Sequence, residues 1–154
     1  MFSASVKGGK KWKEKIVKLK GFKPVLEVGI LASDGATTTE GESVATYATY
    51  NEYGTPTIPA RPFMRQTEAA RVGTWKNIVR KRASSDPDDI IGAFELAGEV
   101  AAKDIQATIE AGGFVANAES TIEAKKRRNK KYTETPLIDD GTMQEAMNYR
   151  VIKQ

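Results

Sequence analysis

Three prolines, at positions 56, 59 and 62, place the strongest constraint on the fold of this chain. The residue before a proline is driven out of the α region, and proline itself donates no backbone hydrogen bond. Residues 55–61 are therefore expected to be extended, and Pro62 suits the first turn of a following helix. The block from Asn51 to Arg65, NEYGTPTIPARPFMR, thus predicts a stiff corner between two helices.

Helices are predicted on both sides of this corner. Ser43 can cap a helix that runs to about Tyr53, and Gly54 can supply its left-handed C-terminal residue. The second helix is expected from Pro62 to about Arg82. Its apolar side chains, which we expect to be buried, are those of Met64, Val72, Trp75, Ile78 and Val79.

The clearest amphipathic pattern of the chain covers residues 87–111. Asp86 is a candidate cap, Pro87 fits the first helical position, and Gly112 follows the last periodic residue. Apolar side chains recur at helical spacing, at Ile90, Phe94, Ala97, Ala101, Ile105 and Ile109. A long central helix is expected here.

Two short apolar runs, at residues 25–31 and 148–153, favour β-strands. A shorter helix is expected at 118–128, and Thr142 with Glu145 forms a capping-box pattern. The predicted fold class is therefore α+β, with a small sheet packed against several helices. Residues 1–154 are expected to form a single domain, with a mobile loop at 32–43 and a basic loop at 125–135.

The chain contains no cysteine and no histidine. Disulfides, thiolate nucleophiles, Ser-His-Asp triads and Cys/His zinc sites are thereby excluded. No apolar run approaches the roughly 20 residues of a membrane span, and the N-terminus lacks the apolar stretch of a secretory signal. These features fit an intracellular protein and leave few groups for acid–base catalysis, and metal binding through carboxylates alone stays open.

Charge is segregated along the chain. Residues 1–23 carry a net charge of +7, residues 24–124 of −7, and residues 125–154 of +4. This pattern favours packing between copies or contact with a polyanion such as DNA, although a solvated face is also typical of such runs. The candidate DNA contacts are Lys125, Lys126, Arg127, Arg128, Lys130 and Lys131.

The basic N-terminal region, residues 1–23, contains a predicted helix at residues 9–20. Trp12, Ile16 and Leu19 lie on one side of this helix, and lysines occupy most of the remainder. Trp12 could stack on a nucleic-acid base, but its helical spacing to the two aliphatic residues indicates a packed face.

Two aspartate groups have alternative interpretations. The segment from Leu137 to Gly141 faintly resembles the Asp-Thr/Ser-Gly loop of aspartic proteases, with Asp139 as the candidate catalytic residue. Asp140 stands where the hydroxyl residue of that loop belongs, so a simple turn explains the segment better. The aspartates 86, 88 and 89 could ligate a metal, but helix capping accounts for them fully.

Aromatic and arginine side chains gather at the proline corner, a composition typical of interface hot spots. The same composition is found at the edge of a protein core, so the corner has two interpretations. The candidate interface residues are Asn51, Glu52, Tyr53, Arg61, Phe63 and Arg65.

Two blocks of this sequence resemble a known family. The first consists of residues 51–55 (NEYGT) and 58–65 (IPARPFMR), and the second of Ser120-Thr121-Ile122 with Lys125, residues 136–139 (PLID), and Gly141, Met143 and Tyr149-Arg150-Val151. They are similar to segments of the tail-completion and neck proteins of tailed phages, including the Mu-like virion morphogenesis proteins. The likeness covers roughly residues 12–152. The chain departs from it at Asp140 and Ala146, where the family usually has Thr and Ser, and in the more basic run 125–131.

The resemblance implies a structural virion protein that is not an enzyme and needs no cofactor. Such proteins form a ring, typically a hexamer, at the junction of head and tail. The implied partners are other copies of the chain, the head connector or adaptor, the tail tube or tail terminator, and the genomic DNA that passes through the ring. The implied location is the virion, after assembly in the bacterial cytoplasm. The alternative is a nucleic-acid-binding accessory protein that acts through its basic N-terminal segment and residues 125–131.

Overall fold

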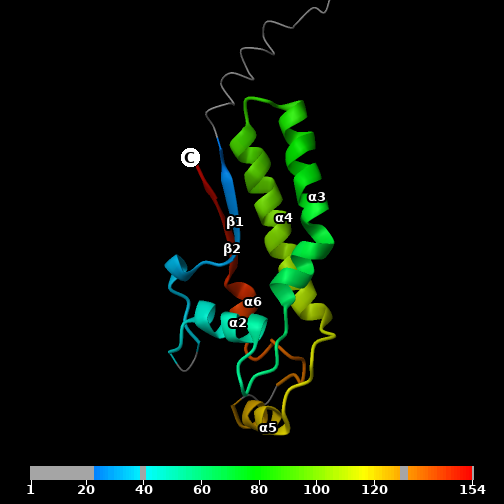
Figure 1. The fold of residues 1–154 in the computed structure, drawn as a ribbon. Helices are drawn as coiled ribbons and strands as arrows, with labels where there is room; N and C mark the ends of the chain where they lie inside the picture. The colour runs from blue at the N-terminus through cyan, green and yellow to red at the C-terminus, as the bar shows by residue number, and fades with distance from the viewer. Residues whose placement is uncertain (1–22, 39–40, 129–131, 154) are drawn as a thin grey trace, which may run out of the picture.

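The computed structural model describes residues 23–38, 41–128 and 132–153, and its longest elements form an antiparallel helical hairpin (Figure 1). Helix α3 spans Phe63–Ser85 and helix α4 spans Ile90–Ala111. The long central helix is therefore confirmed, and its end before Gly112 agrees with the sequence prediction. The predicted helix 9–20 lies outside the described residues.

The start of α4 differs from the prediction by three residues. Asp89, rather than Asp86, is its N-cap, and the Asp89 carboxylate accepts a hydrogen bond from the backbone N–H of Gly92 at 3.0 Å. Asp86 instead terminates α3, where its N–H donates to the carbonyl of Arg82. Reversing the chain between two antiparallel helices requires a turn, and the residues from Asp86 to Asp89 supply it. The capping chemistry was predicted correctly, but the residue that performs it was not.

A two-stranded antiparallel sheet packs against the hairpin. Strand β1 (Val25–Ile30) pairs with strand β2 (Met147–Ile152), so the first and last described elements of the chain lie side by side. The sheet approaches α4 closely because that helix presents small residues. A Cβ atom at Gly98 would overlap the ring of Tyr149 and the side chain of Leu26. The α+β class and both predicted strands are confirmed.

The hydrophobic core lies at the lower end of the hairpin in Figure 1, where three further helices meet it. These are α2 (Val44–Tyr53), α5 (Glu119–Arg128) and α6 (Thr142–Glu145). The buried core residues are Val44, Ala48, Phe63, Ile105, Ile109, Leu137, Met143 and Met147. The α3 side chains Met64, Val72, Trp75, Ile78 and Val79 were expected to be buried, but they are only partly covered.

Several local predictions were wrong in detail. Ser43 is the N-cap of α2 but its side chain makes no capping hydrogen bond. The N-cap of α6 is Gly141, so the Thr142–Glu145 capping box does not form. The predicted loop 32–43 contains a short 3₁₀ helix, Ala32–Asp34, and a bridge between Thr37 and Ser43. Residues 125–128, expected within a basic loop, form the end of α5.

None of the helices in the described part of the chain is both long enough and apolar enough to span a membrane.

Candidate functional site

The proline corner is stabilised by the carboxylate of Glu52, which caps helix α3 from helix α2. Its two oxygens accept hydrogen bonds from the backbone N–H groups of Met64, at 2.8 Å, and Arg65, at 3.1 Å. Pro62 at the N-cap offers no side-chain acceptor for these groups. Glu52 is only 4% exposed, and the positive end of α3 together with Arg65 compensates its buried charge. Glu52 therefore links helix α2 to the first turn of helix α3, and we call this link the brace.

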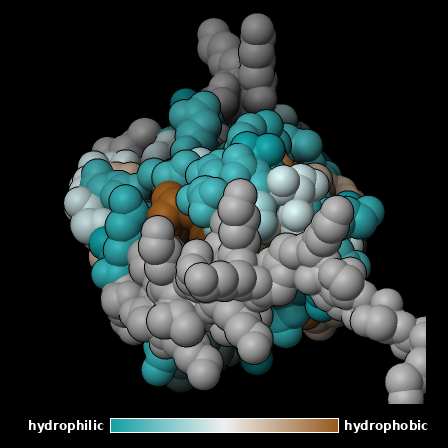
Figure 2. Space-filling view, turned by 90° about the horizontal axis from the view of Figure 1, so that it is seen from above, coloured by the Kyte–Doolittle hydropathy of each residue, from teal (hydrophilic) through white to brown (hydrophobic). Residues whose placement is uncertain are grey.

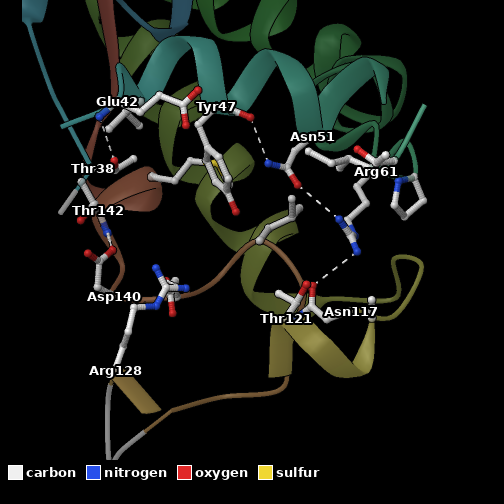
Figure 3. A pocket seen from close by; sticks show the side chains of 18 residues that line it. Thr38, Glu42, Tyr47, Asn51, Arg61, Asn117, Thr121, Arg128, Asp140 and Thr142 are labelled. Carbon is white, nitrogen blue, oxygen red and sulfur yellow. Dashed lines mark hydrogen bonds and ion pairs between the residues drawn. The ribbon is translucent and has the colours of Figure 1, made fainter. Parts of the chain in front are cut away.

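Arg61 joins the corner to the segment that follows α4. Its guanidinium donates to the carbonyls of Val115 (2.8 Å) and Ala116 (3.1 Å) and to the side-chain oxygens of Asn117 and Asn51, both at 3.3 Å (Figure 3). Asn51 in turn donates to the carbonyl of Tyr47 at 3.0 Å. Arg61 is 5% exposed, and burial lowers its pKa, while Tyr47 partly offsets this effect. The guanidinium nevertheless remains charged, because its ordinary pKa is so high.

Lys125, near the end of α5, is also a buried cation that donates hydrogen bonds to backbone carbonyls. Its Nζ donates to the backbone carbonyls of Thr133 (3.3 Å), Thr135 (3.1 Å) and Ile138. Burial lowers the pKa of Lys125, and the nearby Asp139 opposes that shift. Lys125 therefore fixes the chain between α5 and α6, and its ammonium group is turned away from solvent.

These contacts change the interpretation of the six candidate interface residues. Four of them, Asn51, Glu52, Arg61 and Phe63, are buried within the chain and hold the corner together. The fold brings the carbonyls of residues 115–117 to Arg61 from more than 50 positions away, and no local pattern in the sequence announces that contact. Each of these four residues is at most 5% exposed, so they offer almost no surface to another protein.

Tyr53 and Arg65 remain at the surface. Tyr53 is 65% exposed, and the Arg65 guanidinium carbon lies 4.8 Å from the centre of its ring. Tyr50, one turn earlier on α2, is also exposed. We call these three residues the tyrosine patch. A shallow cavity of about 280 Å³, lined in part by Tyr53, Arg65 and Ile30, lies beside it.

The described residues of the basic run 125–131 also differ in their exposure and contacts. Lys126 and Arg127 are exposed, and Lys126 contacts Glu123 at 3.2 Å and the ring of Tyr132. Arg128 forms an ion pair with Asp139 at 3.0 Å. Lys130 and Lys131 lie outside the described residues. Among the described cations of this run, Lys126 and Arg127 are therefore the best placed to meet DNA.

A pocket of about 310 Å³ lies under the corner, between α2, α5 and α6, and Asp139 and Asp140 are among the residues that line it (Figure 3). Asp139 is paired with Arg128, and Asp140 accepts a hydrogen bond from the backbone N–H of Thr142 at 2.9 Å. Hydrogen bonds from Thr142 lower the pKa of Asp140. Asp140 thus serves the start of α6 as a turn-forming side chain, a role that a threonine can also fill. Within the described ranges, no group of three acidic residues is arranged to hold a metal ion.

Comparison with protein-family models, with curated proteins and with solved structures found no match to this chain. The likeness of residues 51–65 to phage neck proteins therefore stays a prediction from sequence. The geometry gives specific contacts to Asn51, Glu52, Arg61 and Arg65 of the block, and it separates the buried residues of the corner from the exposed tyrosine patch.

Proposed function

We propose that this chain is a structural subunit of a tailed-phage virion, which forms a ring at the head–tail junction as a neck or tail-completion protein. The proposal rests on one observation: some residues of the block 51–65 are buried and fix the corner, and others are exposed at its surface. Its buried polar residues make a rigid corner, and this corner holds Tyr53 and Arg65 at the surface. Exposed tyrosine and arginine on a rigid support are the composition of interface hot spots.

The tyrosine patch is the proposed contact between neighbouring subunits. Tyr53 stacks against Arg65, whose backbone N–H and side chain are both anchored by Glu52, so little side-chain freedom remains to be lost on binding. A ring requires a heterologous contact, in which the patch of one copy meets a different surface of the next. The segregation of basic and acidic segments in the sequence supports such a head-to-tail arrangement.

The remaining partners follow from the same role. The ring would contact the head connector or adaptor on one side and the tail tube or tail terminator on the other, with the genomic DNA passing through its centre. The exposed cations Lys126 and Arg127 are candidates for the surface that meets this polyanion. The site of action would be the virion, after assembly in the host cytoplasm.

The experiment is to determine whether the chain is a component of assembled particles and whether it oligomerises. Mass spectrometry of purified particles from a phage that encodes the chain should detect it in several copies per particle. Native mass spectrometry of the full chain, alone and with a connector complex, should detect a closed oligomer in at least one condition. Absence from particles together with a monomer in every condition would reject the proposal. A monomer in free solution that forms a ring on the connector would support it, because the docking surface can supply the missing contacts.

A further inference from the structure

An open apolar groove runs between strand β1 and the helical hairpin, away from the tyrosine patch. Its volume is about 740 Å³. Leu26 and Val28 form one wall, Val72, Trp75 and Val79 of α3 form the other, and Phe94 of α4 lies on the floor. These side chains are only partly covered in the described chain. This groove explains why the apolar stripe of α3 is less buried than its pattern predicts.

The groove lies beside a strand edge and apolar side chains of the kind that folded proteins usually cover. In the described sheet β1 pairs only with β2, so its other edge, beside the groove, carries backbone groups without a strand partner. An exposed strand edge next to apolar side chains is an aggregation hazard that folded proteins usually cover. Glu27, Glu68 and Lys76 also line the groove, and Glu27 forms an ion pair with Arg150 at 2.7 Å. Seen from above, the coloured part of the surface is mainly hydrophilic, with hydrophobic residues showing between the hydrophilic ones (Figure 2).

We infer that residues 9–20 of the same chain bind in this groove as a helix. The sequence pattern gives this segment an apolar stripe of Trp12, Ile16 and Leu19, which suits an apolar groove, and lysines elsewhere that would face solvent. Only residues 21–24 separate it from β1, which is the usual length of a loop between a helix and an antiparallel neighbouring strand.

The dimensions agree with this arrangement. A helix of 12 residues is about 18 Å long, and a six-residue strand such as β1 extends over about 20 Å. A helix that ends just before residues 21–24 and runs antiparallel to β1 would place Leu19 near Val79 and Trp12 near Val72, because the two positions on each helix are seven residues, or about 10 Å of helix, apart. The inference does not depend on the virion role, because it concerns how the chain completes its own fold.

Engineered cysteines test the placement directly, since the chain has none of its own. The full-length double variant Leu19→Cys/Val79→Cys should form an intramolecular disulfide under mild oxidation, and so should Trp12→Cys/Val72→Cys. The mismatched pair Leu19→Cys/Met64→Cys should cross-link at least tenfold more slowly. Equal rates for matched and mismatched pairs, or no cross-linking of the matched pairs, would overturn the inference. Cross-linking between two chains would overturn the assignment to the same chain.

A second measurement uses stability. Ile16→Asp places a charge on the apolar stripe, while Val17→Asp makes the same change one position away from it. Docking predicts that Ile16→Asp lowers the midpoint of thermal unfolding by several degrees, and that Val17→Asp lowers it much less. Equal midpoints for the two variants would contradict docking. This outcome is separable from a failure of the virion proposal, because it is read on the isolated protein.

Discussion

The carboxylate of Glu52 accepts a hydrogen bond from the backbone N–H of Arg65 at 3.1 Å and a second from its guanidinium Nε at 2.9 Å. One buried acidic side chain therefore caps helix α3 and also fixes the arginine that stacks on Tyr53. This relationship links the interior of the proline corner to its surface, and it makes the brace and the proposed interface separately testable.

Removing the cap should destabilise the fold. Glu52→Ala leaves two backbone N–H groups and part of Arg65 without their acceptor, and we expect a loss of about 2–3 kcal/mol in the free energy of unfolding. Glu52→Gln keeps one acceptor oxygen and should cost less. Chemical denaturation monitored by circular dichroism measures both. Glu95→Ala, at an exposed position on α4, is the control and should change stability by less than about 0.5 kcal/mol.

Arg61 should prove structural within the subunit rather than an assembly residue. Lysine cannot reproduce its donors to Val115, Ala116 and Asn117, so Arg61→Lys should lower the free energy of unfolding by about 2 kcal/mol or more. The exposed Arg127→Lys is the matched control and should be nearly neutral. If the Arg61→Lys variant folds with unchanged stability but fails to assemble, Arg61 acts in assembly and not as a structural link between the corner and residues 115–117.

We expect the contribution of Asp140 to the free energy of unfolding to depend on pH. Its pKa is lowered in the folded state by hydrogen bonds from Thr142, so its contribution is fully present above the ordinary carboxyl pKa near 4 and is lost as the pH falls through the lower folded value. Asp140→Ala should therefore cost about 0.5–1 kcal/mol at pH 7 and almost nothing at pH 2. Asp140→Thr, which keeps a side-chain oxygen as acceptor, should recover most of the loss. A cost that is equal at both pH values would contradict the proposed capping role.

DNA contact, if the basic run provides it, should depend on Lys126 and Arg127. Replacing both with alanine should weaken binding of the full chain to duplex DNA and reduce the slope of log K against log salt by about 2. A fluorescence titration at several salt concentrations measures this slope. Replacing the exposed Arg80 and Lys81 of α3 with alanine makes the same change of net charge away from the basic run and is the control. An unchanged slope in the Lys126/Arg127 variant would remove these residues from any DNA surface.

Tyr53 should act on assembly and leave folding intact. It is mostly exposed, so Tyr53→Ala should change the free energy of unfolding by less than about 0.5–1 kcal/mol. As an interface hot spot it should weaken subunit association at least about tenfold. Leu96→Ala, at an exposed apolar residue of α4, is the control and should leave association unchanged. Analytical ultracentrifugation or native mass spectrometry provides the comparison, and equal effects of both variants would argue against the tyrosine patch.

Local signals in the sequence were sufficient to predict the elements of the fold. Alternating β-rich residues marked both strands, and Gly112 marked the end of α4, because these features depend on neighbours along the chain. The start of α4 was misplaced because Asp86 and Asp89 have the same capping chemistry, and only the turn between the helices decides between them.

The candidate site was harder to predict because its decisive contacts are long-range. Arg61 and Lys125 look like surface cations in the sequence, yet each is buried against backbone carbonyls that tertiary folding supplies. Exposed Tyr53 and buried Phe63 stand ten residues apart in one block with no local signal to separate them. Their different roles follow from the direction in which the corner turns each side chain.

A symmetric reconstruction of the head–tail junction in purified particles of a phage that encodes this chain tests the central proposal most directly. We predict a closed ring of copies at the junction, surrounding the DNA passage, with Tyr53 of each copy in contact with the next and Arg61 buried within its own subunit. A junction whose ring layers are all accounted for by other proteins, with no density that fits the α3–α4 hairpin and its two-stranded sheet, would contradict it.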